Sequence, residues 1–361
     1  MPIFWLFPPP METVTVQVPG LEKNFIAVGE NVHCTRILTR KGKRVGESPD
    51  GREAILWTGL DGADRHLVIP DKFKKSNDYQ EGRVKHVQIA AHVAYDGGDD
   101  ATTALDYIRW VVQRQVDAGV DYLDVNTDEF GFKHEQQQAA MRFMVKAVQS
   151  MTDKPLSIDS SLMETIAAGM KAYDASVGRP LLNSASLERI DALDLAVKHQ
   201  CEVIITAAGK SGMPNGTAQR VDHASQMIDA AIEKGIALSD IQADLLVFPI
   251  SVDTTFGLHY LDAVRIIRSR YGPEVHITGG MSNVSFGIPA RLLVNDVFIN
   301  LAIEYGADGG IIDPVARPIH GVVELDQDSA PYQFAKAMLV GEDRNCKQFL
   351  RAYRNGELDS W

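Results

Sequence analysis

VDYLDVN (residues 120–126) has the pattern of a short β-strand that ends in polar side chains. PLSID (residues 155–159) has the same pattern. The segment between them is typical of an amphipathic helix, because apolar residues recur every three or four positions, at Ala140, Phe143, Met144, Ala147 and Val148. A strand, a helix and a second strand in this order form the repeating unit of a parallel sheet.

The same unit recurs along the chain. Six further strand patterns are FIAVGEN (25–31), LLNSAS (181–186), CEVIITAA (201–208), DLLVFPIS (244–251), VHITGG (275–280) and DGGIIDPV (308–315). Helical patterns separate several of them, at about Leu162–Tyr173, Ile190–His199 and His223–Lys234. A doubly wound sheet also alternates strands and helices, so the number of strands decides: eight units predict an α/β protein with a closed (β/α)₈ barrel of the TIM type.

Two regions fall outside the repeating units, and we interpret the chain as a single domain over residues 1–361. Residues 32–100 form an insertion after the first strand, rich in charged residues and in Gly-Asp turns such as DGGDD (96–100). We expect it to cover one end of the barrel or to form a subunit contact. Residues 325–361 are predicted to be a C-terminal helical tail.

The composition narrows the class of protein. Hydrophobic residues make up 45% and charged residues 23%, and the formal net charge is −12, which disfavours nucleic acid and anionic membranes as partners. The three cysteines, Cys34, Cys201 and Cys346, lie far apart, which fits the reducing cytoplasm. The opening MPIFWLFPPP lacks the basic start of a signal peptide, and we expect a soluble protein without a membrane span.

Polar side chains close most of the predicted strands. In a barrel the carboxyl ends of all strands meet at one mouth, where the active sites of such barrels lie. A single polar residue there could merely cap the next helix. Six strands sharing the feature predict a site, with the side chains Glu30, Asn31, Asp124, Asn126, Asp159, Asn183, Asn283 and Asp313.

These strand-end groups are carboxylates and carboxamides with few cations, a combination that suits a ligand with several N–H donors. A pterin ring presents such donors along one edge. Asp159 would accept two of them in parallel, and Asn183 can both donate and accept. A phosphate ligand is the alternative, since Gly pairs occur at 279–280 and 309–310, but neither opens a helix with a GxG pattern.

The sequence resembles the pterin-binding methyltransferases, namely the methyltetrahydrofolate:corrinoid methyltransferases and the folate domain of cobalamin-dependent methionine synthase. The resemblance covers about residues 25–40 and 114–320. It rests on VGEN (28–31), YLDVNTDE (122–129), LSIDSS (156–161), LLNSAS (181–186), DLLVFPI (244–250) and GGMSNVSFGIP (279–289). It implies a barrel enzyme that moves a methyl group between N5 of tetrahydrofolate and the cobalt of a corrinoid.

The resemblance also implies roles for individual residues. Asp159, Asn183 and Asp244 would hold the edge of the pterin, and Asn283 would act on N5 as the catalytic residue. The other predicted contacts line the mouth: Glu30, Asp124, Asn126 and Asp313. Simpler roles exist for three of these: Asp244 as a cap at the start of its strand, Asn126 as an anchor for its loop, and Asn283 as a turn residue.

Cobalamin is expected on a partner. Corrinoid modules carry a D-x-H-x-x-G signature, and the nearest match, DRHLVI (64–69), lacks the glycine. The prediction is therefore a separate corrinoid protein that docks over the mouth, with tetrahydrofolate or methyltetrahydrofolate as the small substrate and a homodimer as the assembly. The direction of methyl transfer stays open.

Other functions remain as alternatives. Dihydropteroate synthases share the barrel, but they carry a lysine late in strand seven, where this chain has HITGGMSN. A non-catalytic subunit that docks a corrinoid protein within a demethylase system is a second alternative. A Schiff-base aldolase using Lys210 is disfavoured, because that lysine lies in a glycine-containing loop.

The first motif departs from the family pattern. It reads GENVHCTR, with His33 where asparagine is common, and Leu245 replaces the proline that often follows the strand-six aspartate. His33 and Cys34 together suggest a metal site, but neighbouring residues on a strand point to opposite faces, so no metal is predicted.

Overall fold

The computed structural model describes residues 16–18, 21 and 23–359. The apolar segment MPIFWLFPPP (1–10) lies outside the described residues. Within them, no helix is long and apolar enough to cross a membrane.

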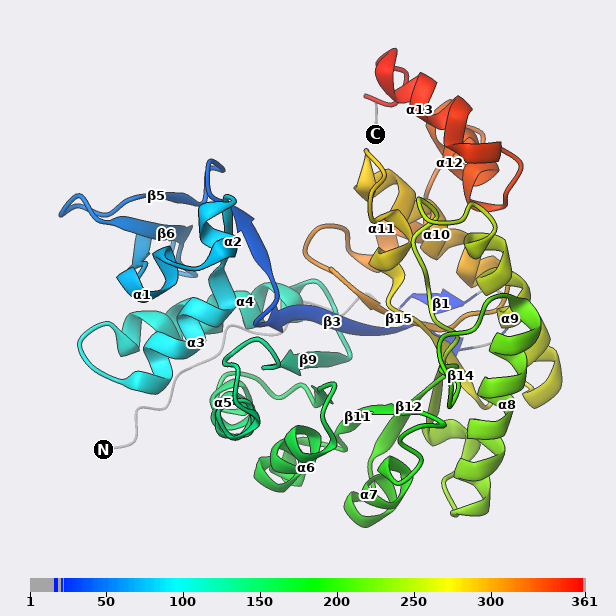
Figure 1. Cartoon of the computed structure of the whole chain (residues 1–361), viewed down its shortest axis with the longest axis horizontal. Coiled ribbons are helices and arrows are strands. Elements are labelled where there is room, and N and C mark those ends of the chain that lie inside the picture. The colour runs from blue at the N-terminus through cyan, green and yellow to red at the C-terminus, as the bar shows by residue number, and fades with distance from the viewer. Residues whose placement is uncertain (1–15, 19–20, 22, 360–361) are drawn as a thin grey trace.

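Eight parallel strands form a closed barrel (Figure 1). The strands are β3 (Ile26–His33), β9 (Tyr122–Asn126), β10 (Leu156–Asp159), β11 (Leu181–Ala185), β12 (Glu202–Thr206), β13 (Ile241–Asp244), β14 (His276–Thr278) and β15 (Gly309–Ile312). Each pairs with its neighbour in chain order, and β15 returns to pair with β3. A parallel bridge between Gly280 and Ile311 joins β15 to the end of β14, which closes the ring. The prediction of a (β/α)₈ barrel is confirmed.

Helices surround the barrel, because each turns an apolar stripe to the strands. They are α4 (Ala101–Asp117), α5 (His134–Gln149), α6 (Met163–Ala172), α7 (Ala192–His199), α8 (Thr217–Glu233), α9 (Phe256–Tyr271) and α10 (Arg291–Glu304). Of the five residues predicted from their spacing in α5, Ala140, Met144 and Val148 are fully or almost fully buried, and Phe143 and Ala147 are partly buried. Burying these stripes stabilises the barrel by roughly 25 cal/mol per Å² of apolar surface.

The predicted sixth strand was wrong in position. The strand is Ile241–Asp244, and residues 245–251 form the loop after it. Two residues explain the end of the strand: Leu246 has a φ of +63°, and Pro249 has no N–H for a ladder bond. The loop is apolar because it is buried, with Leu245 fully buried. Asp244 therefore ends the strand and does not cap its start.

The first strand runs two residues further than predicted and ends at His33. Its pairing with β9 shifts register between Gly29 and Val32, which marks a β-bulge. The backbone N–H of Asn31 at the bulge donates to Oε1 of Gln115 on α4, at 3.0 Å. The bulge brings His33 to the mouth of the barrel.

The insertion after β3 is an α/β layer at the mouth side of β3 and β9 (Figure 1). Its elements are β4 (Ile37–Thr39), β5 (Val45–Glu47), β6 (Glu53–Thr58), β7 (Asp64–Val68), α1 (Asp71–Lys74), α2 (Asn77–Gln80), β8 (Arg83–Lys85) and α3 (His86–Asp96). Lys85 pairs with Glu129 at 2.8 Å, and His92 Nε2 lies 2.5 Å from the carbonyl oxygen of Phe130. Of the two predicted roles, the structure thus shows the insertion packed against the barrel beside its mouth.

The C-terminal region is helical, as predicted, and consists of α11 (Ile319–Val323), α12 (Ala330–Leu339) and α13 (Lys347–Arg354). It packs on α10, where Tyr332 donates a hydrogen bond to Oδ1 of Asn300 at 2.8 Å. At the other end of the chain, β1 (Gln17–Val18) and β2 (Lys23–Asn24) form a small hairpin before the barrel.

Candidate active site

The barrel gathers the predicted side chains at the carboxyl ends of its strands. Those on the first four strands lie at their ends or inside the mouth: Glu30 on β3, Asp124 and Asn126 on β9, Asp159 on β10, and Asn183 on β11. The others complete the ring: Asp244 at the end of β13, Asn283 in the 3₁₀ turn Met281–Ser285 after β14, and Asp313 after β15.

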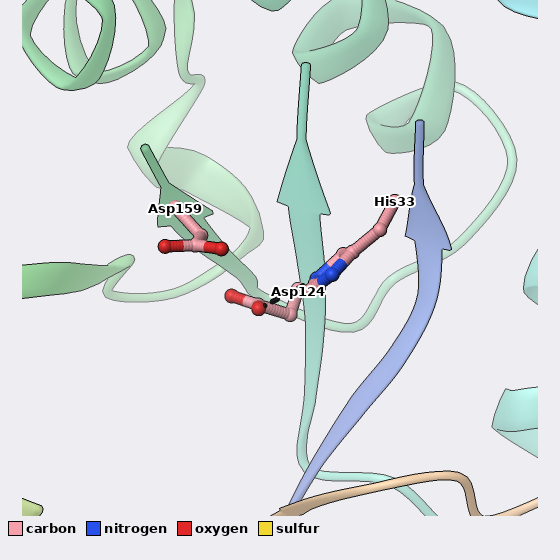
Figure 2. Close-up of side chains that lie close together, drawn as sticks. All are labelled: His33, Asp124 and Asp159. Atoms are coloured by element: carbon pink, nitrogen blue, oxygen red, sulfur yellow. Dashed lines mark hydrogen bonds and ion pairs between the residues drawn. The ribbon is translucent and has the colours of Figure 1, made fainter. Parts of the chain in front are cut away.

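Three titratable side chains from adjacent strands meet in the mouth (Figure 2). Nε2 of His33 lies 2.7 Å from Oδ2 of Asp124, which is almost fully buried. Asp159 stands on the other side of Asp124, and one ligand atom of each of the three lies within 4.8 Å of the others. The imidazole therefore supplies the only positive charge available inside this described cluster of two carboxylates.

Two carboxamides hold these carboxylates in place. Nδ2 of Asn126 donates to Oδ2 of Asp159 at 2.8 Å, and Nδ2 of Asn183 donates to Oδ1 of Asp124 at 3.5 Å. Oδ1 of Asn126 also accepts the N–H of Asp128 at 3.0 Å. Asn126 thus orders its loop, as the simpler interpretation expected, and contacts the predicted pterin carboxylate as well.

The surroundings shift the pKa values of this cluster. Burial, and then the charge of Asp124, raise the pKa of Asp159 well above its usual range. Burial alone would lower the pKa of His33, but the hydrogen bond to Asp124 and the charges of Asp124, Asp159 and Glu30 together outweigh it, and the net shift is upward. The imidazolium of His33 in turn favours the ionised form of Asp159. The imidazolium therefore offsets only part of the effect of burial and of Asp124, and the pKa of Asp159 stays raised.

Asp244 is the second predicted pterin carboxylate. Burial raises its pKa to about 6, although the N–H of Leu246 donates to Oδ1 at 2.8 Å and the charge of Arg220 opposes the shift. Arg220 is fully buried, stacks over the ring of Phe248 at 4.7 Å, and donates from Nε to the carbonyl oxygen of Leu246. The charge of this arginine favours the ionised form of Asp244, which is the form that would accept the N–H donors of a pterin.

Two hydrogen bonds from Arg291 hold the turn that contains Asn283. Arg291 donates from Nε to Oγ of Ser285 at 3.0 Å and from Nη2 to the carbonyl oxygen of Ser282 at 3.1 Å. A Cβ on Gly280 would stand 2.8 Å from Nδ2 of Asn283, so a side chain at position 280 would displace the carboxamide of Asn283. The half-buried carboxamide of Asn283 makes no side-chain hydrogen bond within the described chain, which leaves it available to a ligand.

Glu30 and Asp313 occupy the part of the mouth between β3 and β15, and Arg36 binds both. Nη1 of Arg36 lies 3.1 Å from Glu30, and Nη2 bonds Asp313. Asn31 adds a bond to Asp313 at 2.9 Å, and Ser282 one to Glu30 at 3.1 Å. These carboxylates are therefore already paired within the chain, and their predicted contact with substrate would require them to share these partners.

Comparison with known proteins gives the family. The family model of pterin binding enzymes matches residues 95–313. The chain is also 30% identical over 259 residues to the methylcorrinoid:tetrahydrofolate methyltransferase of Eubacterium limosum, an alignment that covers 70% of this chain and 89% of that protein. The chain belongs to the pterin-binding methyltransferases.

Other proteins are more distantly similar. The methionine synthase of Mycobacterium tuberculosis (strain ATCC 25618 / H37Rv) is 26% identical over 233 residues, which are 60% of this chain and 19% of that much longer protein. Among solved structures, the 7,8-dihydropteroate synthase of Vibrio fischeri ES114 aligns with a TM-score of 0.48 and 18% identity, covering 62% of this chain and 85% of that one.

This pterin-binding methyltransferase contains site residues that sequence reasoning missed. His33 was considered only as a metal ligand, because the first strand was predicted to end at Asn31; Cys34 beside it is buried in the core, where burial raises the pKa of its thiol. Arg36 and Arg220 do not lie at the end of a predicted strand, so the pattern of polar strand ends did not select them. Lys210 is exposed, which does not suit a Schiff-base lysine.

The trio of His33, Asp124 and Asp159 is the group of described residues whose geometry would admit a metal ion. Each member already bonds a neighbour: His33 bonds Asp124, and Asp159 accepts from Asn126. The donors therefore satisfy one another, and their carboxylate oxygens suit the N–H edge of a pterin equally well.

Proposed function

We propose that this methyltransferase moves a methyl group from the cobalt of a separate methylcorrinoid protein to N5 of tetrahydrofolate. The observation that carries the proposal is the arrangement of Asp159, Asn183, Asp244 and Asn283 around one mouth, in a chain that spans 89% of a methylcorrinoid:tetrahydrofolate methyltransferase. The activity of that relative, from methylcorrinoid to tetrahydrofolate, supports the direction of transfer.

The pterin ring would bind by its N–H edge. Ionised Asp159 and Asp244 accept N–H donors, and Asn183 contributes one donor and one acceptor. Both carboxylates are deeply placed with raised pKa values, so an N–H donor gains an acceptor that water solvates poorly. This part of the site orients the ring and leaves N5 toward β14.

Asn283 would act at N5. In tetrahydrofolate N5 carries a proton, which Oδ1 of the carboxamide can accept as a hydrogen bond; in the product N5 carries the methyl group, and Nδ2 can donate to it. The N5 lone pair forms the new N–C bond, the electron pair of the cobalt–carbon bond stays on cobalt, and the N5 proton leaves to water. A neutral amide assists both forms without adding a competing charge.

The corrinoid itself fits a partner better than this chain. His66 of DRHLVI lies on β7, where its backbone pairs antiparallel with Leu56 of β6, so it belongs to the small three-stranded sheet of the insertion. When the partner is docked, the corrinoid would supply a methyl group on cobalt. The residues described here would only bind and orient tetrahydrofolate beneath it.

Exposed apolar side chains mark where such a partner would dock. One stands on each of five loops at the mouth, and we name this set the apolar rim: Phe132, Ile190, Met213, Val252 and Phe286. Phe132 is fully exposed, Val252 is 75% exposed and Met213 is 63% exposed. A ring of apolar groups around a polar mouth is typical of a protein-binding surface, and a corrinoid protein centred on it would bring cobalt over the pterin.

The assay that tests the function mixes the protein with methylcobalamin and tetrahydrofolate and follows the loss of methylcobalamin by its absorbance. Free methylcobalamin replaces the unidentified partner. We expect turnover in the native protein and none in Asp159→Asn. The matched control Asp240→Asn, at a half-buried carboxylate that pairs with Arg179, should keep full activity. Tetrahydrofolate binding by calorimetry without any methyl transfer, in either direction, would reject the reaction.

A charge on the apolar rim tests the docking surface. Val252→Asp and Met213→Asp are both exposed substitutions, so folding should persist. With the cognate corrinoid protein we expect KM for that protein to rise at least tenfold, while the rate with free methylcobalamin stays unchanged. Equal losses with both methyl donors would place the effect in the site and not at a docking surface.

We further propose a homodimer in the cytoplasm, with residues 1–361 folding as one unit. The free, buried thiols of Cys34, Cys201 and Cys346 support a reducing compartment. Light scattering after gel filtration measures the assembly, and a monomer would contradict it. Calorimetric unfolding in one transition would support a single unit, whereas a separate transition for the insertion would contradict it.

A further inference from the structure

A second cavity lies beside the barrel mouth, between the insertion and the loop after β9. It measures about 880 Å³, within the range of small-molecule sites. The insertion contributes α1, α2, β8 and α3, and the barrel contributes the loop Asp128–Phe132 and the start of α5. None of the residues assigned above to the pterin lines this cavity.

The cavity is connected to the pterin site through Asp128. This residue lines the cavity, and it also accepts the N–H of Ser161 at 2.8 Å and the hydroxyl of Ser160. Ser160 directly follows Asp159. One short loop therefore forms both a wall of the cavity and the support of the predicted pterin carboxylate.

Aromatic rings form one side of the cavity. Phe130 stacks on His92 with ring centroids 3.8 Å apart and planes within 8°, and Phe73 meets His92 edge-on at 5.2 Å. Phe132 stands at the edge with its side chain fully exposed. Such a wall favours a flat, aromatic ligand group.

The rest of the lining carries the cations Lys72, Lys75, Arg83 and Lys85 together with the carboxylates Asp78, Asp128 and Glu129, in a protein of net charge −12. Lys85 forms ion pairs with both Asp78 and Glu129. Two other lysines at the edge of this cavity, Lys72 and Lys75, are not paired on two sides. Lys72 pairs only with Asp96 on the exposed surface, and Lys75 makes no ion pair among the described residues. Both are exposed; Lys72 also lies over the ring of Phe73 at 5.2 Å, so an anion in the cavity would compete with Asp96 for it.

We propose that this cavity binds the p-aminobenzoyl-glutamate part of the folate, with the benzoyl ring against Phe130 and Phe132 and the glutamate carboxylates on Lys72 and Lys75. The inference rests on the proposed function, which places the pterin in the mouth. The carboxylate-rich mouth repels a glutamate tail, whereas the adjoining cavity offers an aromatic wall and cations. Folates with several γ-linked glutamates add carboxylates and so bind more tightly than the monoglutamate.

Calorimetric titration with three probes tests the proposal: 6-methyltetrahydropterin, which has no tail, tetrahydrofolate, and tetrahydrofolate triglutamate. We expect affinity to rise in that order. The double variant Lys72→Ala/Lys75→Ala should weaken triglutamate binding by about tenfold, because two exposed ion pairs are lost, and leave the tail-less pterin unchanged. Phe132→Ala, at a fully exposed position, should weaken both tailed folates about threefold, and the control Lys41→Ala/Lys43→Ala, elsewhere on the insertion, should change nothing.

The outcomes separate the two proposals. Failure of native protein to bind 6-methyltetrahydropterin would reject the pterin site itself. Binding of that probe with equal affinity for all three ligands, or an unchanged preference for the triglutamate in Lys72→Ala/Lys75→Ala, would reject only the tail site. An equal loss for all three probes in that variant would likewise contradict a role confined to the tail.

Discussion

The two ends of the barrel each contain a buried aspartate, but they treat it differently. At the amino end, Asp308 is fully buried and accepts from Arg268 at 2.7 Å, from His276 at 2.8 Å and from the N–H of Ile277 at 2.7 Å. Burial alone would raise its pKa, but these partners outweigh it, and the pKa of Asp308 lies below its usual range.

At the mouth, Asp159 accepts one hydrogen bond from a neutral amide and faces the charge of Asp124, while Asp244 accepts one backbone N–H. Both have raised pKa values. The comparison teaches that burial alone does not mark a structural carboxylate. A carboxylate whose partners are complete stabilises the fold, and one whose partners are incomplete is available for a ligand.

The largest expected effect is on stability at the amino end. Asp308→Asn leaves the guanidinium of Arg268, which is only 11% exposed, without its counter-charge, so we expect a loss of about 3–5 kcal/mol in the free energy of unfolding. Urea denaturation at pH 7 measures it. The control Asp240→Asn, which breaks an exposed pair with Arg179, should cost less than about 1 kcal/mol. Equal losses in both variants would remove the distinction between the two kinds of carboxylate.

The next largest effect is on catalysis at the mouth. Asn283→Ala removes the group proposed to act at N5, and we expect kcat to fall about 100-fold to 1,000-fold. Because Asn283 makes no side-chain bond within the described chain, the melting temperature should change little. A large drop in stability with an unchanged kcat would assign Asn283 to the fold.

The raised pKa of Asp244 predicts a pH dependence of folate binding. The ionised carboxylate accepts the pterin N–H donors, and the protonated form does not. With a pKa of about 6, lowering the pH from 7 to 5 should weaken binding about tenfold, and the raised pKa of Asp159 adds to the loss in the same direction. Titrations across this range measure it, with the ligand's own ionisation determined separately. A flat profile would show that neither carboxylate binds in its ionised form.

The smallest expected effect is the change in stability on replacing Asp159 at the mouth, and it distinguishes this residue clearly from Asp308 at the amino end. Asp159→Asn removes a charge that stands beside Asp124, so the free energy of unfolding at pH 7 should stay unchanged or rise by about 1 kcal/mol, although pterin binding is lost. Thermal denaturation of the native protein and the variant decides this. A loss as large as that expected for Asp308→Asn would mean that Asp159 is needed for the fold.

Much of the fold could be predicted from the sequence, because buried parallel strands are uninterrupted apolar runs and the helices between them show a regular stripe. The sixth strand shows the limit. DLLVFPIS is as apolar as a strand, but it is a buried loop, and nothing in its composition reveals the positive φ of Leu246. The arrangement of the insertion depended on contacts with the barrel and could not be predicted from its turns.

The residues of the site also fall into those that could be predicted from the sequence and those that could not. Asp159, Asn183 and Asn283 could be proposed because a barrel brings strand ends together and the motifs around them resemble a family. The positions of His33, Arg36 and Arg220 could not, since each is defined by a partner far away in the chain. The predicted mouth contacts Glu30 and Asp313 carried no sign that one arginine binds both.

The β-bulge in β3 limits how the motif GENVH (29–33) can be transferred to another barrel. On a regular strand Glu30 and Asn31 would point to opposite faces, yet through the bulge both reach the network of Arg36 and Asp313. The bulge depends on Gln115, a fully buried residue of α4 that is 84 positions away along the chain from Asn31. A designer who grafts GENVH onto another barrel must therefore carry the glutamine of the following helix with it, or the grafted side chains will turn away from the mouth.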